Sequence, residues 1–162
     1  MKSIASTLSF LFALSAFSAI EPITSFNPGF YLGSGSYRTS TGVNGATASY
    51  ISFGSEGWNI IQLRNNTVHF YGSVLDIDEN GFFTIQFTDT SNPAQPISAE
   101  GYGNCATNKC QFTVSLAHGQ LHKILEFDGS HNLLHSYGVI RYQDGTASVQ
   151  WEEDNFRLPS TK

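Results

Sequence analysis

The sequence predicts an all-β protein, a single-domain antiparallel up-and-down β-barrel of about eight to ten strands behind a cleaved signal peptide. Short segments with alternating apolar and polar residues run through 29–158, and a period of two is typical of strands. Hairpin-type pairs such as Asn80-Gly81 separate these segments. All five prolines fall outside 29–92 and 97–158, as expected where each segment donates backbone hydrogen bonds to both neighbours.

The N-terminus has the pattern of a signal peptide over residues 1–19. Lys2 provides a basic start, and the apolar stretch 8–14 is too short to cross a bilayer. Ala16-Phe17-Ser18 then matches the small-x-small pattern that signal peptidase reads. We therefore expect an exported protein, secreted or periplasmic, with no transmembrane segment in its mature form. An N-terminal helix that stays as an anchor is the alternative.

Glycine and Asn/Asp punctuation divides the rest of the chain into strands. The barrel domain is expected over 29–158, between a short N-terminal segment (20–28) and a tail (159–162), with a loop over 90–96. The expected turns are Asn44-Gly45, Asn65-Asn66, Asn80-Gly81, His118-Gly119 and Asp144-Gly145. The expected strands are 29–40, 45–54, 58–64, 67–77, 81–89, 97–104, 110–117, 120–127, 132–142 and 146–157. A β-sandwich is the alternative arrangement of the same strands.

The expected turns fix which side chains face the interior. The His118-Gly119 turn places Lys123 on the inward face with the apolar side chains of Phe112, Val114, Leu116, Leu121, Leu125 and Phe127. Continuing that face across 128–132 adds Leu133, His135 and Tyr137. The last strand is expected to bury Ala147, Val149 and Trp151. Its pairing would then turn Gly138, Ile140 and Tyr142 inward, whereas the preceding hairpin turns the odd-numbered Tyr137 inward. A one-residue bulge near Gly138-Val139 would reconcile the two halves.

The same reasoning applies to the strands before the long loop. Ile61 and Leu63 are expected inward beside Val68 and Phe70. The next inward side chains are those of Val74, Phe83, Ile85 and Phe87. The side chains of Arg64, His69 and Tyr71 are expected to point to solvent.

Composition limits the classes of partner. The chain has 8 Lys and Arg against 13 Asp and Glu, and it lacks basic runs, so neither nucleic acid nor an anionic membrane surface is an expected partner. Only 13% of the residues are charged while 14% are aromatic. The aromatic surface must be buried in a core or presented to a ligand. We expect a monomer.

Two cysteines, Cys105 and Cys110, flank a four-residue loop. In an exported protein this spacing indicates a disulfide that joins two strands. Two thiols without a nearby histidine make a poor metal site, and the spacing is not that of a redox Cys-x-x-Cys pair. The segment 76–81 matches the start of a calcium loop, but Phe87 stands where a bidentate Glu is needed. A hairpin turn is favoured there, and no cofactor or metal is expected.

Gly29-Phe30-Tyr31 near the start of the first strand, together with Arg157 near the end of the last, resembles the calycin group of lipocalins and fatty-acid-binding proteins. That group opens with Gly-x-Trp and packs the aromatic ring against a basic residue from the end of the barrel. Tyr31 takes the place of the Trp here. The resemblance implies a closed barrel of eight or ten strands that holds an apolar or amphipathic molecule. It assigns Gly29, Tyr31 and Arg157 to a structural end-cap.

Two functions follow from these observations. In the first, the barrel interior binds a small hydrophobic or amphipathic ligand, with Lys123 and His135 as polar hooks. The expected contacts beside them are Phe70, Phe87, Leu125, Tyr137 and Trp151. For Lys123 a structural explanation is slightly favoured over ligand binding: the side chain lies near an open end of the barrel and extends its ammonium group to water.

In the alternative, the core is filled and the protein is an adhesion or effector-like module. It would contact a protein or a glycan through its loops and through the exposed aromatic residues Trp58, Tyr71 and Tyr102. An enzyme is the least expected class because no nucleophile and base are visible as a pair. An interior void above roughly 300 Å³ would favour the ligand, and a filled core would favour the alternative.

Overall fold

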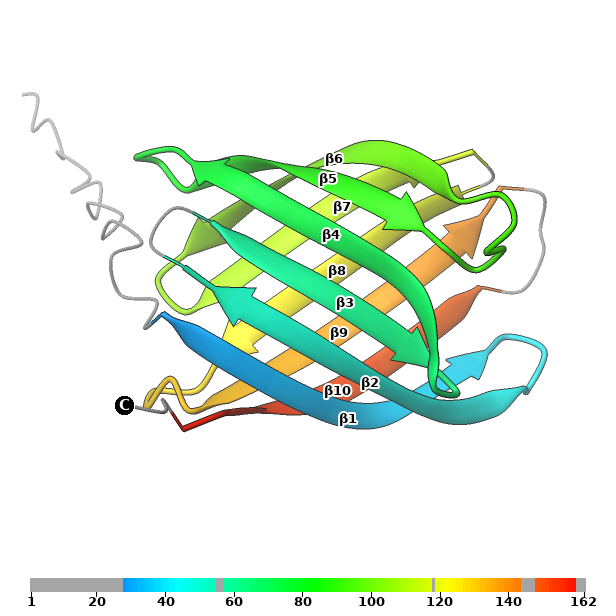
Figure 1. Ribbon diagram of the computed structural model, residues 1–162, viewed down its shortest axis with the longest axis horizontal. Coiled ribbons are helices and arrows are strands. Elements are labelled where there is room, and N and C mark those ends of the chain that lie inside the picture. The colour runs from blue at the N-terminus through cyan, green and yellow to red at the C-terminus, as the bar shows by residue number, and fades with distance from the viewer. Residues whose placement is uncertain (1–27, 55–56, 118, 144–147, 160–162) are drawn as a thin grey trace, which may run out of the picture.

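Ten antiparallel strands close into one barrel in a computed structural model that describes residues 28–54, 57–117, 119–143 and 148–159 (Figure 1). Each strand pairs with its neighbours in sequence, and the first pairs with the last. The strands are β1 (Gly29–Thr39), β2 (Asn44–Phe53), β3 (Trp58–Arg64), β4 (Thr67–Ile77), β5 (Phe82–Asp89), β6 (Ile97–Ala106), β7 (Lys109–Leu116), β8 (Gly119–Phe127), β9 (Leu133–Tyr142) and β10 (Val149–Arg157). The predicted signal peptide, His118 and the Asp144-Gly145 turn lie outside the described residues.

The barrel prediction is confirmed, and two of the predicted turns, Asn65-Asn66 and Asn80-Gly81, contain the expected positive φ. Asn65 and Asn66 have φ of 49° and 64°, and Gly81 has φ of 85°, as the tight hairpin turns require. The prediction of a turn at Asn44-Gly45 is wrong, because both residues belong to β2. The chain reverses just before them, around Gly42 with φ of 88°. Within the described residues no helix is long and apolar enough to cross a membrane.

The predicted register between β8 and β9 is wrong. Phe127 pairs with Leu134 rather than Leu133, and the Asp128 amide donates to the Leu133 carbonyl. A shift of one residue moves every side chain of a strand to the opposite face. The side chains of His135 and Tyr137 therefore point outward, contrary to prediction. The pairing of β9 with both neighbours runs through Gly138 without interruption, so the predicted bulge is wrong too.

A bulge does occur in β4, and it changes which side chains of the β3–β4 hairpin face the interior. Leu63 pairs with Val68 while Gln62 pairs with Phe70, which leaves His69 as the extra residue. The buried side chains of β3 are those of Trp58, Ile60 and Gln62. Ile61 and Val68 are exposed, so their predicted inward positions are wrong, and so is the predicted exposure of Trp58. The inward positions of Phe70, Val74, Phe83, Ile85 and Phe87 are confirmed.

Aromatic rings fill both ends of the barrel interior. At the end where β1 begins, Tyr31, Phe53 and Phe127 pack with ring centroids 5.1–5.8 Å apart, and Trp58 joins them to Phe83 and Phe112. At the other end Phe70 packs against Phe87 at 4.9 Å and against Trp151 at 5.9 Å. Such clusters bury large apolar areas and favour edge-to-face contacts. Part of the high aromatic content is therefore core, and part of it lies on the outer wall.

The end-cap residues of the calycin resemblance lie together. Tyr31 and Arg157 are directly paired between β1 and β10, and the Tyr31 hydroxyl donates to the His131 carbonyl at 2.7 Å. The Arg157 guanidinium passes over Gly29, whose missing side chain leaves room for it, and donates to the Pro28 carbonyl at 2.7 Å. A closed ten-strand barrel is compatible with a calycin-like fold.

The predicted disulfide is confirmed. Cys105 and Cys110 face each other across β6 and β7, form the bond, and are both buried. It closes a tight hairpin, so its effect on the entropy of the unfolded chain is small. Disulfides of this kind are typical of exported proteins.

Gly138 offers a test of the interior packing. A Cβ at Gly138 would lie 2.0–2.6 Å from atoms of the Trp151 indole ring. Gly138→Ala should therefore lower the free energy of unfolding by about 1–3 kcal/mol, as overpacking does, and should change the near-ultraviolet circular dichroism of the tryptophans. Urea unfolding provides the measurement.

Gly129→Ala is the matched control, because a Cβ there meets nothing within 4 Å. It should change the free energy of unfolding by no more than about 0.5 kcal/mol. Equal stability of the two variants would mean that Trp151 does not lie over Gly138.

Candidate functional site

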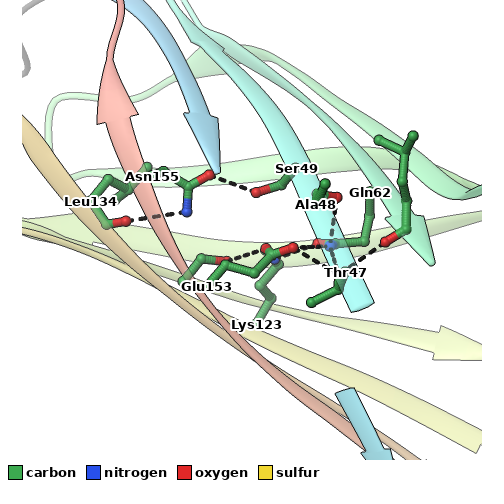
Figure 2. A network of polar contacts seen from close by, with 10 residues as sticks. Thr47, Ala48, Ser49, Gln62, Lys123, Leu134, Glu153 and Asn155 are labelled. Atoms are coloured by element: carbon green, nitrogen blue, oxygen red, sulfur yellow. Dashed lines mark hydrogen bonds and ion pairs between the residues drawn. The ribbon is translucent and has the colours of Figure 1, made fainter. Parts of the chain in front are cut away.

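A layer of polar side chains crosses the barrel interior, and Figure 2 shows its contacts. Its centre is an ion pair between Lys123 of β8 and Glu153 of β10, with Nζ 3.8 Å from Oε2 and both side chains fully buried. Gln62 of β3 joins the pair: its Oε1 accepts from Lys123 Nζ at 2.9 Å, and its Nε2 donates to Glu153 Oε1 at 2.5 Å. Thr47 of β2 donates to the same Glu153 oxygen at 2.8 Å.

A second group of contacts extends this layer toward the end where β1 begins. Ser49 donates to Asn155 Oδ1 at 2.6 Å, and Asn155 Nδ2 donates to the Leu134 carbonyl at 3.2 Å. Ser136 donates to the second oxygen of Glu153 at 3.3 Å. The Glu153 carboxylate thus receives a partner at each oxygen, as a buried charge requires.

Burial dominates the electrostatics of the pair. Removal from water lowers the pKa of Lys123 from 10.5 to about 8, and the Glu153 carboxylate opposes that shift. The ammonium also lies 5.2 Å from the Trp151 ring centroid and 5.9 Å from that of Phe70, within range of a cation–π attraction. Snorkelling is therefore wrong for Lys123, whose charge is held inside by an anion, an amide and two aromatic faces.

The interior next to this layer is almost full. A void of about 10 Å³ lies beside Thr47, Gln62 and Phe70, under Tyr37 and Arg64 at the barrel end. That is about the space one water molecule needs. The Arg64 guanidinium covers the Tyr37 ring at 4.7 Å, and burial together with Arg64 lowers the pKa of the neighbouring His69 to about 4.

The predicted contact residues are divided between the inside and the outside of the barrel. Lys123, one of the two predicted polar hooks, is buried in the interior together with Phe70, Phe87, Leu125 and Trp151. His135 and Tyr137 lie on the outer wall. His135 Nδ1 is 2.6 Å from an Asp154 carboxylate oxygen there.

Several interior polar residues were missed by the sequence interpretation: Glu153, Asn155, Gln62, Thr47, Ser49 and Ser136. Alternation along the last strand could have found Glu153 and Asn155, because they continue the inward-facing series that begins with Val149 and Trp151. Gln62 could not be found in that way because the bulge at His69 reverses the parity of its hairpin.

Two grooves lie on the outer wall. The aromatic groove, about 480 Å³, crosses β4, β5 and β6 and is lined by Leu75, Phe82, Tyr102, Asp76, Asp78, Ser73, Thr84 and Gln86, among others. The arginine groove, about 620 Å³, crosses β8, β9, β10 and β1 and is lined by Arg38, Arg141, Tyr137, His122, Ile124, Val139, Gln150 and Glu152, among others. In the cyclic strand order the two grooves lie on opposite walls of the barrel.

In the part of the chain that the structure describes, no three His, Cys, Asp or Glu side chains are grouped to hold a metal ion. The 76–81 segment forms a hairpin turn in which Asp78 Oδ1 accepts from the amides of Asn80 and Phe82 at 2.9 and 2.8 Å.

Comparisons of the sequence with protein-family models and with curated proteins, and of the structure with solved structures, give no match.

The buried ion pair makes a strong prediction for stability. Glu153→Gln removes the anion and leaves the Lys123 ammonium unpaired in the interior, which should cost about 3–5 kcal/mol of unfolding free energy. The double variant Lys123→Met/Glu153→Leu removes both charges and should recover most of that loss. Urea unfolding followed by tryptophan fluorescence measures both. A Glu153→Gln variant as stable as the wild type would contradict the burial of the pair.

The pH dependence of stability has a defined sign. Because the pKa of Lys123 is about 8 in the folded protein against 10.5 for the free side chain, the unfolded chain holds this proton more tightly. The free energy of unfolding contributed by Lys123 should therefore rise from about pH 8 toward about pH 10. Lys123→Met lacks this contribution, so the wild type should gain stability relative to it over that interval. Parallel pH profiles for the two proteins would refute the assignment.

Proposed function

We propose that this protein is an exported interaction module with a filled core, and that it binds a neutral glycan in the aromatic groove. The observation that carries the proposal is the exposure of three large apolar side chains around one hollow: Leu75 is 76% exposed, Tyr102 67% and Phe82 61%. Exposed apolar side chains gathered in one place are characteristic of binding surfaces.

The strand register places the aromatic rings on one face. Phe82 pairs with Asn104 and Tyr102 pairs with Thr84 across β5 and β6, so Phe82 and Tyr102 are diagonal neighbours on the outer wall, about 7–8 Å apart. Leu75 follows the inward-facing Val74 in β4 and therefore points outward beside them. Rings at this spacing form a platform for the flat, C–H-rich face of a pyranose.

The polar part of the groove matches a polyhydroxyl ligand. Its lining includes the hydroxyls of Ser73 and Thr84, the amide of Gln86 and the carboxylates of Asp76 and Asp78. These groups can donate to and accept from sugar hydroxyls in the same hollow. No Lys, Arg or His is among its lining residues, and the carboxylates would repel an acidic sugar. The groove therefore favours a neutral glycan.

A ligand inside the barrel, which the sequence also predicted, is less well supported. It would have to displace packed aromatic rings and separate Lys123 from Glu153, since the void beside them is only about 10 Å³. Sites for small molecules usually have about 300–1,000 Å³. The outer groove offers that space without rearrangement.

Export remains part of the proposal. It is supported by the signal-peptide pattern of residues 1–19 and by the disulfide between Cys105 and Cys110. A module that acts outside the cell meets the glycans of cell surfaces and matrices.

Binding to a panel of neutral oligosaccharides tests the proposal. Cellohexaose, chitohexaose, xylohexaose and mannohexaose are titrated into the purified protein by calorimetry. We expect one or more to bind, with preference for sugars whose hydroxyls are equatorial, because these expose flat apolar faces. Tyr102→Ala and Phe82→Ala should each weaken binding by about two- to twelvefold, the loss of one stacked ring.

Tyr71→Ala is the matched control. Tyr71 is an exposed tyrosine of β4 that does not line the groove, so its loss should leave the affinity unchanged. Lack of binding to the whole panel, or equal losses in the Tyr71 and Tyr102 variants, would sink the proposal.

A further inference from the structure

We propose that the arginine groove is a second and separate ligand site, which binds a small amphipathic anion: a carboxylate or sulfonate on an aromatic or aliphatic body. The site lies on the wall opposite the aromatic groove and does not depend on the glycan proposal. The ligand chemistry is the one that the sequence predicted for the interior, and Tyr137, one of the predicted contacts, lines this groove.

The distribution of cations singles out this groove. The protein is acidic, with a net charge of −5 and only 8 Lys and Arg. Most of the cations in the described residues are engaged or lie elsewhere: Lys123 is buried in its ion pair, Arg64 covers Tyr37, and Arg157 is held by the Pro28 carbonyl. Lys109 lies on the disulfide hairpin, outside the groove and opposite Glu126. Arg38 and Arg141 are both exposed, and both line the same hollow.

One arginine is held in place and the other is free to bind. With the Gln150 side-chain oxygen turned toward it, the Arg38 guanidinium donates to that oxygen from Nε and Nη2. Arg141 makes no hydrogen bond or ion pair with any residue that the structure describes. A free guanidinium fork is well suited to a carboxylate or a sulfonate, which it can bind through two parallel hydrogen bonds.

The register arranges the groove into an apolar middle and two unlike ends. Tyr137 pairs with Ile124 on one side and Glu152 on the other. Arg141 lies four residues further along β9, about 13 Å away, with Val139 between them. Glu152 therefore lies at the Tyr137 end and Arg141 at the opposite end. A ligand with its apolar body on Tyr137, Ile124 and Val139 would place its anion at Arg141 and keep it away from Glu152.

Size agrees with this chemistry. The groove holds about 620 Å³, within the range of about 300–1,000 Å³ that accommodates small organic molecules. His122, whose Nδ1 lies 3.1 Å from the Thr113 hydroxyl, adds a further ring to the wall beside Val139. The floor thus combines aliphatic and aromatic surface with a cation at one end.

Two matched fluorescent probes test the proposal. The probe 8-anilinonaphthalene-1-sulfonate has an aromatic body and a sulfonate, and N-phenyl-1-naphthylamine has the same body without the charge. The native protein should bind the sulfonate at least about tenfold more tightly than the neutral probe, because charged hydrogen bonds contribute that much or more. Arg141→Glu should reduce the affinity for the sulfonate by at least about tenfold and leave the neutral probe little changed.

The control is Lys109→Glu, which makes the same change of charge at an exposed cation outside the groove and should retain full affinity. Tyr137→Ala should weaken both probes, while His135→Ala, on the same outer face but outside the groove lining, should weaken neither. Unfolding midpoints of the variants are measured alongside, so that probe bound to partly unfolded protein is recognised.

Equal affinities of the two probes, or equal losses in the Lys109 and Arg141 variants, would overturn the site. Loss of binding in Lys123→Met but not in Arg141→Glu would place the anion in the interior and overturn it as well. The glycan titrations use different variants and a different ligand, so failure of either proposal leaves the other standing.

Discussion

The ion pair between Lys123 and Glu153 is the constraint on which the interior of this barrel depends. Two fully buried charges 3.8 Å apart are tolerated only when each has further partners. Gln62 forms a hydrogen bond with each member of the pair, and Thr47 and Ser136 donate further hydrogen bonds to the Glu153 carboxylate. These residues come from five different strands, so the layer fixes how opposite walls of the barrel meet. Between two aromatic ends, it leaves little free space.

A filled interior supports the proposal that recognition takes place on the outer wall. A closed barrel has no free strand edge on which a partner could add a strand, so recognition falls to side chains that stand out from the wall. Two opposite walls have them, with different chemistry: rings, hydroxyls and carboxylates around Tyr102 on one, and two arginines over an apolar floor around Tyr137 on the other. A rigid core suits such a role, because it holds both sets of side chains in fixed positions.

Sequence reasoning located the strands and the disulfide, since alternation, proline placement and turn residues are local signals. It failed where one extra residue in a loop or a bulge determines which side chains of a strand face the interior. The loop after Phe127 put His135 and Tyr137 outside, and the extra residue His69 brought Gln62 inside and Ile61 out. Lys123 was found because its own hairpin has a clean register. Its partners were not, because a contact between β3, β8 and β10 is long-range and no local pattern records it.

The most direct measurement of the central claim is the nuclear Overhauser effect between Lys123 and Trp151 in the native protein. If the side chains fill the interior, the Lys123 ε-methylene protons give cross-peaks to the Trp151 and Phe70 rings, and their resonances shift upfield from the aromatic ring currents. The ammonium protons would also exchange slowly with water. Absent cross-peaks and a rapidly exchanging ammonium would show an open interior and contradict the account.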